Sequence, residues 1–156
     1  MKTLVLGLGN ELLSDDAVGI LAARALKPRL DGRADVVESA LSGLALLDLF
    51  IGYDRAVIID AIQTGKSSPG TILEISPADL DAVRAPSAHY SGLPELLTIA
   101  RELALDFPRE IDILGVEVAD LLTIGGPVSE PVQNAIPEIV RRVSSRIPPG
   151  THEKTH

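Results

Sequence analysis

Cysteine and tryptophan are absent from the chain, and aromatic residues make up only 3% of it. Because there is no cysteine, disulfides, thiolate metal sites and cysteine nucleophiles are excluded. Basic residues are few, since 14 Lys and Arg stand against 22 Asp and Glu, and the net charge of −8 argues against nucleic acid as a partner. No apolar run reaches the length of a membrane span, and no signal peptide precedes the first apolar run. We therefore expect a cytoplasmic protein without a membrane partner, and we take it to be a monomer.

The residues that are present predict one globular α/β domain. The 156 residues are enough to bury a core, and 46% of them are apolar. Apolar runs of strand length alternate with helical patterns, which predicts a mostly parallel sheet with helices on both faces. The domain is expected to span 1–148, and the last residues, 149–156, are expected to be a disordered tail.

The predicted fold is a three-layer α/β/α sandwich of the phosphorylase/hydrolase-like type. Its five-stranded sheet is twisted and mostly parallel, begins with the order 2-1-3, and could have one antiparallel edge strand. In the second helix, the residues expected to face the core are Leu44, Leu47, Phe50 and Ile51. Pro137 is expected to kink or interrupt the last helix. The predicted strands are the opening apolar run, 35–38, 55–60, 71–75 and 111–116, and the main predicted helices are 17–30, 42–52, 94–105 and 129–147.

The loop after the first strand is the most informative stretch. It begins Gly7-Leu8-Gly9, and the two glycines are expected to let the backbone turn tightly because glycine tolerates positive φ. Two adjacent carboxylates, Asp15 and Asp16, then stand where a helix begins, and Ser14 or Asp15 can cap its free N–H groups. One acid is thus explained, and Asp16 is left over. With the strand order 2-1-3, Asp16 meets Asp60, which ends the third predicted strand, in a crevice at the carboxyl end of the sheet.

Three patterns for phosphate or metal binding are present but imperfect. Gly7-Leu8-Gly9 imitates a dinucleotide-binding loop, but Leu12 occupies the place of the third glycine. Residues 60–67 imitate a P-loop, but Asp60 replaces the first glycine. The HExxH pattern of residues 152–156 follows Pro-Pro-Gly and has no third ligand after it, so we interpret it as part of a solvated tail.

His89 is the only histidine inside the predicted fold. Taken alone it is best interpreted as a surface or helix-capping residue, and Asp60 alone as the cap of a turn. Together with Asp16, these residues make a set of nitrogen and oxygen ligands that suits a borderline divalent metal.

The motif at residues 7–19, GLGNELLSDDAVG, resembles the signature of the hydrogenase maturation endopeptidases. Enzymes of that family remove a C-terminal extension from the nickel-containing large subunit of NiFe hydrogenase. The resemblance covers nearly the whole chain in order. It continues through VIIDAI at 57–62, PGT at 69–71, HYSGL at 89–93 and GVE at 115–117.

The resemblance implies an endopeptidase whose precursor substrate already carries nickel, so that the metal would arrive with the substrate. The family's metal ligands correspond to Asp16, Asp60 and His89, and either aspartate could act as the general base. The alternative, from a different class, is a non-catalytic nickel- or nucleotide-binding module on the same sheet. We expect asparagine at either aspartate to leave the fold intact, on the assumption that both side chains are exposed. The substrate contacts that we assign on the same basis are Gly9, Asn10, Ser42 and Gly43.

Overall fold

The computed structural model describes residues 1–41, 43–77, 93–119, 121 and 123–149, in which five strands and four α-helices make up most of the regular structure. The strands are β1 (Thr3–Leu8), β2 (Asp35–Ser39), β3 (Arg55–Ile62), β4 (Ile72–Ile75) and β5 (Glu110–Glu117). The helices are α1 (Val18–Leu26), α2 (Leu47–Phe50), α3 (Leu93–Glu102) and α4 (Glu130–Arg146), and two 3-10 turns, η1 (Asp15–Ala17) and η2 (Gly43–Leu46), precede α1 and α2.

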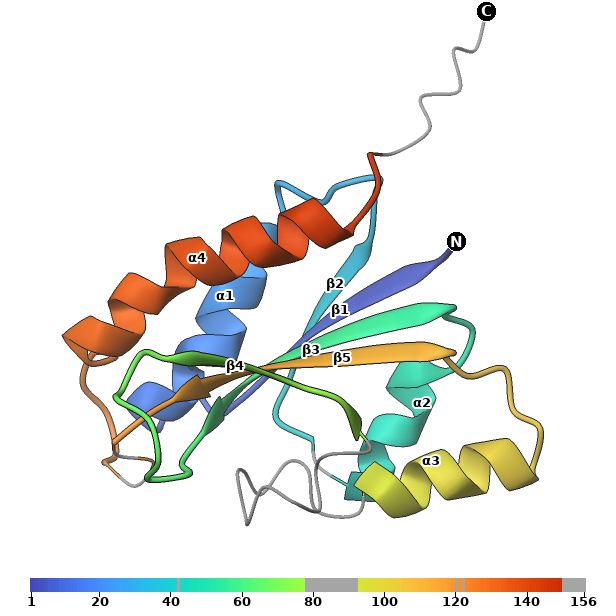
Figure 1. Cartoon of the computed structure of the whole chain (residues 1–156), viewed down its shortest axis with the longest axis horizontal. Helices are drawn as coiled ribbons and strands as arrows, with labels where there is room; N and C mark the ends of the chain where they lie inside the picture. The colour runs from blue at the N-terminus through green and yellow to red at the C-terminus, as the bar shows by residue number, and fades with distance from the viewer. Residues whose placement is uncertain (42, 78–92, 120, 122, 150–156) are drawn as a thin grey trace, which may run out of the picture.

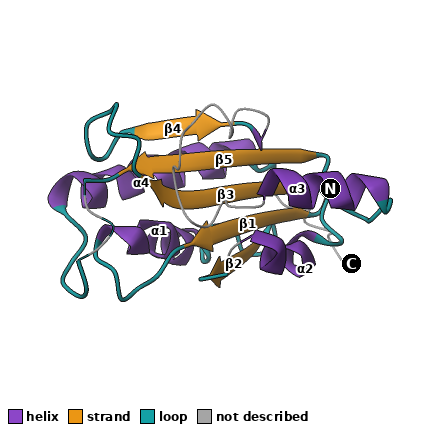
Figure 2. Ribbon diagram, turned by 90° about the horizontal axis from the view of Figure 1, so that it is seen from below, coloured by secondary structure: helices purple, strands orange, loops and turns teal. Residues whose placement is uncertain are grey.

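The five strands lie side by side in the order β2-β1-β3-β5-β4 (Figure 2). β1 pairs in parallel with β2 and β3, and β3 pairs in parallel with β5, whereas β4 is antiparallel to β5. The predicted mostly parallel sheet, its 2-1-3 start and its antiparallel edge strand are therefore confirmed. Because β2, β1, β3 and β5 run the same way, the loops that follow them meet at one end of the sheet (Figure 1).

Helices cover both faces of the sheet, α1 and α4 on one face and α2 and α3 on the other (Figure 1). Residues of β3 alternate between the two sides, because Val57 and Ile59 pack with α1 and α4, while Ile58 and Ile62 pack with α2 and α3. A strand that is buried on both faces is a continuous apolar run rather than an alternating one, as the sequence predicts for this stretch. The three-layer sandwich is thus confirmed.

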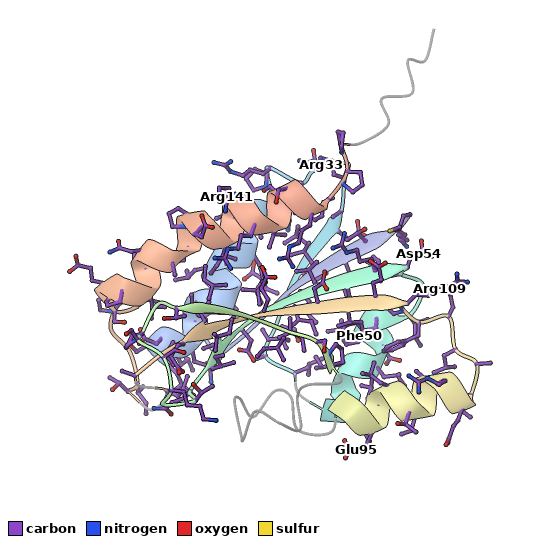
Figure 3. All side chains as sticks on the ribbon, viewed as in Figure 1. Arg33, Phe50, Asp54, Glu95, Arg109 and Arg141 are labelled. Carbon is purple, nitrogen blue, oxygen red and sulfur yellow. The ribbon has the colours of Figure 1, made fainter. Side chains whose placement is uncertain are left out.

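The segment between β2 and β3 is less helical than expected. It forms η2 and the four-residue helix α2, in which Phe50 is buried against the sheet (Figure 3). The prediction that Leu44 and Ile51 face the core is wrong, because both side chains are exposed. A helix of four residues completes little more than one turn, so it cannot sustain a periodic apolar face.

α4 is the longest of these helices, with 17 residues, and Pro137 does not interrupt it. Its buried face, which includes Ile136 and Ile139, packs in the same cluster as α1. This tertiary packing outweighs the hydrogen bond that an internal proline removes. None of the helices in the described ranges combines the length and the apolarity that a membrane span requires.

The carboxyl end of α4 is held by a side chain from a distant turn. Arg33, which precedes β2, donates hydrogen bonds to the carbonyl oxygens of Ser144 at 3.1 Å and Pro148 at 3.2 Å, and also to that of Ile147 (Figure 3). The guanidinium thereby satisfies carbonyl groups to which the last turn of a helix supplies no donor.

Candidate active site at the carboxyl end of the sheet

Asp60 lies inside β3, which continues to Ile62 rather than ending at the aspartate as predicted. The strand continues because β5 pairs with it as far as Glu117. By alternation Asp60 is on the face of Ile58 and Ile62, toward α2 and α3, and its side chain is 0% exposed. Its Oδ1 accepts a hydrogen bond of 2.8 Å from the backbone N–H of Ala61. Carboxylates are rarely buried this completely, so Asp60 is a candidate for a functional role.

Asp16 is the middle residue of η1, between β1 and α1, and it is 8% exposed. Because η1, which follows β1, contacts β3, Asp16 and Asp60 come from neighbouring elements at the same end of the sheet. The expectation that both side chains are exposed is wrong, since both are buried. Asparagine at either position is therefore a change in the interior, and its effect on stability has to be measured.

Three glycines, which have no side chain, allow the backbone of β1 and the first loop to lie directly against the backbone of η1 and α1. A Cβ atom at Gly9 would lie 2.2 Å from the carbonyl oxygen of Asp16, and one at Gly7 would lie 2.3 Å from that of Gly19. None of these three glycines has a positive φ, so the prediction that the loop glycines serve a tight turn is wrong. They are required because any side chain would push η1 and α1 away from β1, and this close approach fixes the position of Asp16.

The predicted cap of the first helix is also wrong. Neither η1 nor α1 has a side-chain cap at its N-terminus. Asp15, which is buried, instead accepts hydrogen bonds from the backbone N–H of Ser129 at 2.7 Å and from its hydroxyl at 3.0 Å. Ser129 is the N-cap residue of α4, so the carboxylate of Asp15 lies where a helix favours negative charge. Asp15 is therefore bound to the start of α4, and the assignment of Asp16 to the site stays a prediction.

The predicted substrate contacts lie along the same loops. The N–H of Gly9 donates to the carbonyl of Ser39 at 3.1 Å, which joins the first loop to the end of β2. Asn10 accepts a hydrogen bond of 2.9 Å from the N–H of Leu12 through its side-chain oxygen. Gly43 begins η2, whereas Ser42 lies outside the described residues.

His89, the third predicted metal ligand, also lies outside the described residues. Within the described ranges, no three His, Asp or Glu side chains are grouped closely enough to hold a metal ion. A site that includes Asp16 and Asp60 therefore needs a further ligand from elsewhere, and the sequence predicts that His89 supplies it.

Glu117, which enters the sequence analysis only within the GVE motif, is a further buried acid at the carboxyl end of the sheet. It is buried at the end of β5, opposite Ile62 of β3. Its carboxylate accepts hydrogen bonds from the N–H groups of Thr64 at 2.8 Å and Ser67 at 3.2 Å, and from the hydroxyl of Thr64. These are amides of the P-loop-like stretch, and they bind a carboxylate, which agrees with the rejection of a phosphate loop. The sequence signal was available, because an apolar run that ends on an acid also marks Asp60.

The family model for "Hydrogenase maturation protease" matches residues 20–146. This chain belongs to the hydrogenase maturation protease family. The matched stretch contains Asp60 and His89 and begins shortly after Asp16.

Relatives and solved structures agree with this assignment. The hydrogenase 2 maturation protease of Escherichia coli K12 is 32% identical over 120 residues, which cover 74% of this chain and 73% of that protein. The structure of the hydrogenase maturating endopeptidase HybD from E. coli matches with a TM-score of 0.76 at 28% identity, over 92% of this chain and 90% of that one. HybD from Thermococcus kodakarensis matches with a TM-score of 0.75 at 28% identity, over 95% and 100%. The prediction of a maturation endopeptidase is thus confirmed, and the matches favour it over the non-catalytic binding module.

Proposed function

We propose that this maturation protease removes the C-terminal extension from the nickel-loaded precursor of a NiFe hydrogenase large subunit, and that Asp16, Asp60 and His89 bind the substrate's nickel. The observation that carries the proposal is the pair of carboxylates, 8% and 0% exposed, on neighbouring elements at the carboxyl end of the sheet. Membership of the family supplies the reaction class, and the names of the relatives point to hydrogenase as the substrate.

The two carboxylates are suited to hydrolysis of a peptide bond. Water adds to the scissile carbonyl carbon, the carbon–nitrogen bond breaks, and the proton taken from the water ends on the leaving amine. A carboxylate held next to the scissile bond can accept that proton and pass it on. We assign this role to Asp16 or Asp60, because each is buried and held in place by backbone.

Nickel enters this scheme as part of the substrate. Two carboxylates and one imidazole are oxygen and nitrogen ligands of the kind that nickel accepts, and they leave coordination positions for ligands of the precursor. An ion held by so few ligands should bind weakly to the enzyme alone, so that only precursor that already carries nickel is cleaved. Action as a cytoplasmic monomer remains a prediction from the sequence.

The test is cleavage of a purified precursor of a NiFe hydrogenase large subunit, with and without nickel. The enzyme is truncated before Thr151 so that His152 and His156 cannot bind metal. We expect release of a C-terminal fragment from nickel-loaded precursor alone, and at least a hundredfold loss of kcat/KM in Asp16→Asn and Asp60→Asn. Asp48→Asn, at an exposed position in α2, is the matched control and should retain full activity.

Two results would contradict the proposal. Efficient cleavage of nickel-free precursor, or chelator-resistant nickel in the isolated enzyme, would contradict the proposal that nickel arrives with the substrate and is required for cleavage. Full activity in both aspartate variants would remove the site itself. Denaturant unfolding of each variant separates loss of chemistry from loss of fold.

A further inference from the structure

Asp15 is a buried carboxylate to which the proposed reaction gives no role. It is 2% exposed, and both of its oxygens are bound by Ser129, since Oδ1 accepts from the backbone N–H at 2.7 Å and Oδ2 from the hydroxyl at 3.0 Å. A carboxylate is costly to bury, and this one is bound at the start of α4, 114 residues further along the chain. We call this pair of hydrogen bonds the Asp15–Ser129 tether.

The hydroxyl of Ser129 does not cap its own helix. Serine at the N-cap of a helix normally accepts a hydrogen bond from an N–H group of the first turn. Ser129 is the N-cap residue of α4, yet its side chain makes no such bond, and its hydroxyl donates to Asp15 instead. The hydroxyl therefore serves the first loop rather than the helix that it begins.

The tether is the last of several contacts between the first loop and the segment between β5 and α4. Leu13 pairs with Ile124 in an antiparallel β-bridge. The N–H of Ser14 donates to the carbonyl of Thr123 at 3.0 Å, and its hydroxyl donates to the carbonyl of Pro127 at 3.2 Å. The tether extends this joined stretch to the first residue of η1.

Asp16 follows the tether directly and is the middle residue of η1. The hydrogen bonds of a 3-10 turn are poorly aligned, and in η1 the N–H of Ala17 donates to the carbonyl of Ser14 at 3.3 Å. After Asp16 the backbone is held by close approach, because a Cβ atom at Gly9 would lie 2.2 Å from the carbonyl oxygen of Asp16. The backbone is therefore held on both sides of Asp16, by the tether before it and by the first loop after it.

We infer that Asp15 and Ser129 are positioning residues for the hydrolysis, because their tether holds η1 where the carboxylate of Asp16 can take part. The inference rests on the proposed function. Asp15 acts through Asp16 rather than on the substrate, since it is 2% exposed and both of its oxygens already accept hydrogen bonds. Misplacing a reacting group by about 1 Å can lower a rate about a hundredfold, so a partial loss of position should cost about tenfold.

Amide hydrogen exchange tests whether the tether holds η1. The N–H of Val18 donates to the carbonyl of Asp15, and Ala22, in the middle of α1, is the internal reference. In Asp15→Ala we expect exchange at Val18 to accelerate about tenfold more than exchange at Ala22. Ser129→Ala should give a smaller change in the same direction, because the backbone N–H at this position remains a donor. Equal acceleration at both amides, or none, would overturn the inference.

The kinetics of cleavage of nickel-loaded precursor test what the tether does. We expect kcat to fall about tenfold in Asp15→Ala and less in Asp15→Asn, which keeps one acceptor oxygen, with KM unchanged. In the Asp16→Asn background, Asp15→Ala should cause no further loss, because the carboxylate that the tether places is already gone. Arg33→Met, which removes the donor at the other end of α4, is the control for loss of stability and should retain full kcat. All variants are assayed where urea unfolding shows them to be folded.

The outcomes separate this inference from the proposed function. An unchanged kcat in Asp15→Ala, or an equal loss in the wild-type and Asp16→Asn backgrounds, would overturn the inference and leave the proposed function standing. A raised KM with unchanged kcat would make Asp15 a contact of the precursor and would also overturn it. If the wild type releases no fragment, the proposed function fails, and hydrogen exchange at Val18 then decides by itself whether the tether holds η1.

Discussion

Gly19 is the second residue of α1, and backbone fills the space where its side chain would project. A Cβ atom at this position would lie 2.3 Å from the carbonyl oxygen of Leu8 and 2.4 Å from that of Ile59. Both oxygens belong to buried strands, β1 and β3, and neither can rotate away as a side chain could. We therefore predict that Gly19→Ala destabilises the protein, although alanine is the better helix former.

The magnitude follows from two opposing effects. Replacing glycine by alanine inside a helix ordinarily stabilises by about 1 kcal/mol. Against this, α1 must retreat by about 1 Å to restore van der Waals contact, and overpacking of this kind costs about 1–3 kcal/mol. The overpacking cost lies at the upper end of this range, because the new Cβ atom would clash with two backbone oxygens at once. The net loss is about 2 kcal/mol, which corresponds to a fall of roughly 4–8 °C in Tm for a domain of this size.

The measurement is urea unfolding of wild type, Gly19→Ala and a control in the same helix. Ala25 is exposed in α1, so Ala25→Gly measures the helix propensity term alone and should cost about 1 kcal/mol. A Gly19→Ala protein that is as stable as the wild type, or more stable, would refute the reasoning, since it would show that α1 can move off the strands without loss.

Three further predictions concern contacts away from Gly19. Asp15→Ala should cost about 1–3 kcal/mol in urea unfolding, because the N–H and hydroxyl of Ser129 lose their acceptor, and Asp15→Asn should cost less; equal stability of Asp15→Ala and wild type would contradict this. Arg33→Met keeps the apolar stem but removes the donor to the last carbonyls of α4, so we expect a loss of about 1 kcal/mol, and a neutral result would count against that cap. Burial, and then the hydrogen bond to a neighbouring aspartate, raise the pKa of Tyr53 to about 12. The raised pKa of Tyr53 stabilises the folded protein in full below the ordinary tyrosine pKa of about 10, and this stabilisation is lost as pH rises toward 12. Absorbance titration of the Tyr90→Phe variant follows the ionisation of Tyr53 directly. Ionisation of Tyr53 near pH 10 would exclude the shift.

Much of the fold could be predicted because local patterns of apolar residues in the sequence indicate where the strands and helices lie. The apolar run at 57–59 predicts a strand buried on both faces, and Val57, Ile58 and Ile59 do alternate between the two helical layers. Helix caps and lengths were harder to predict. Leu44 and Ile51 fit a helical pattern, but the chain makes only one short helix there, and both remain exposed. Local periodicity states which face could be buried, whereas packing decides how much of it is.

The candidate site was predicted in part for the same reason. Asp60 stands out because it follows an apolar run, and Asp16 because it is left over once the neighbouring acid is explained as a cap; the 2-1-3 order brings their elements to one end of the sheet. Their burial could not be predicted, since it depends on how the helices pack on the sheet: Asp16 is placed by the close approach of the first loop and α1 to the strands, and Asp60 lies on the opposite face, toward α2 and α3. The role of Glu117 was missed because the amides it binds belong to another loop.

The sequence by itself determined the set of strands, their mostly parallel order, the family and the presence of surplus acids in the first loop. These depend on apolar periodicity and on short motifs, which are local properties of the chain. Only the tertiary structure decided which groups Asp15 binds. Asp15 looks like the cap of the helix that follows it, yet it binds Ser129, 114 residues away, at the start of α4. A side chain bonds to whichever groups packing brings within about 3 Å, and no local pattern specifies which distant backbone that will be.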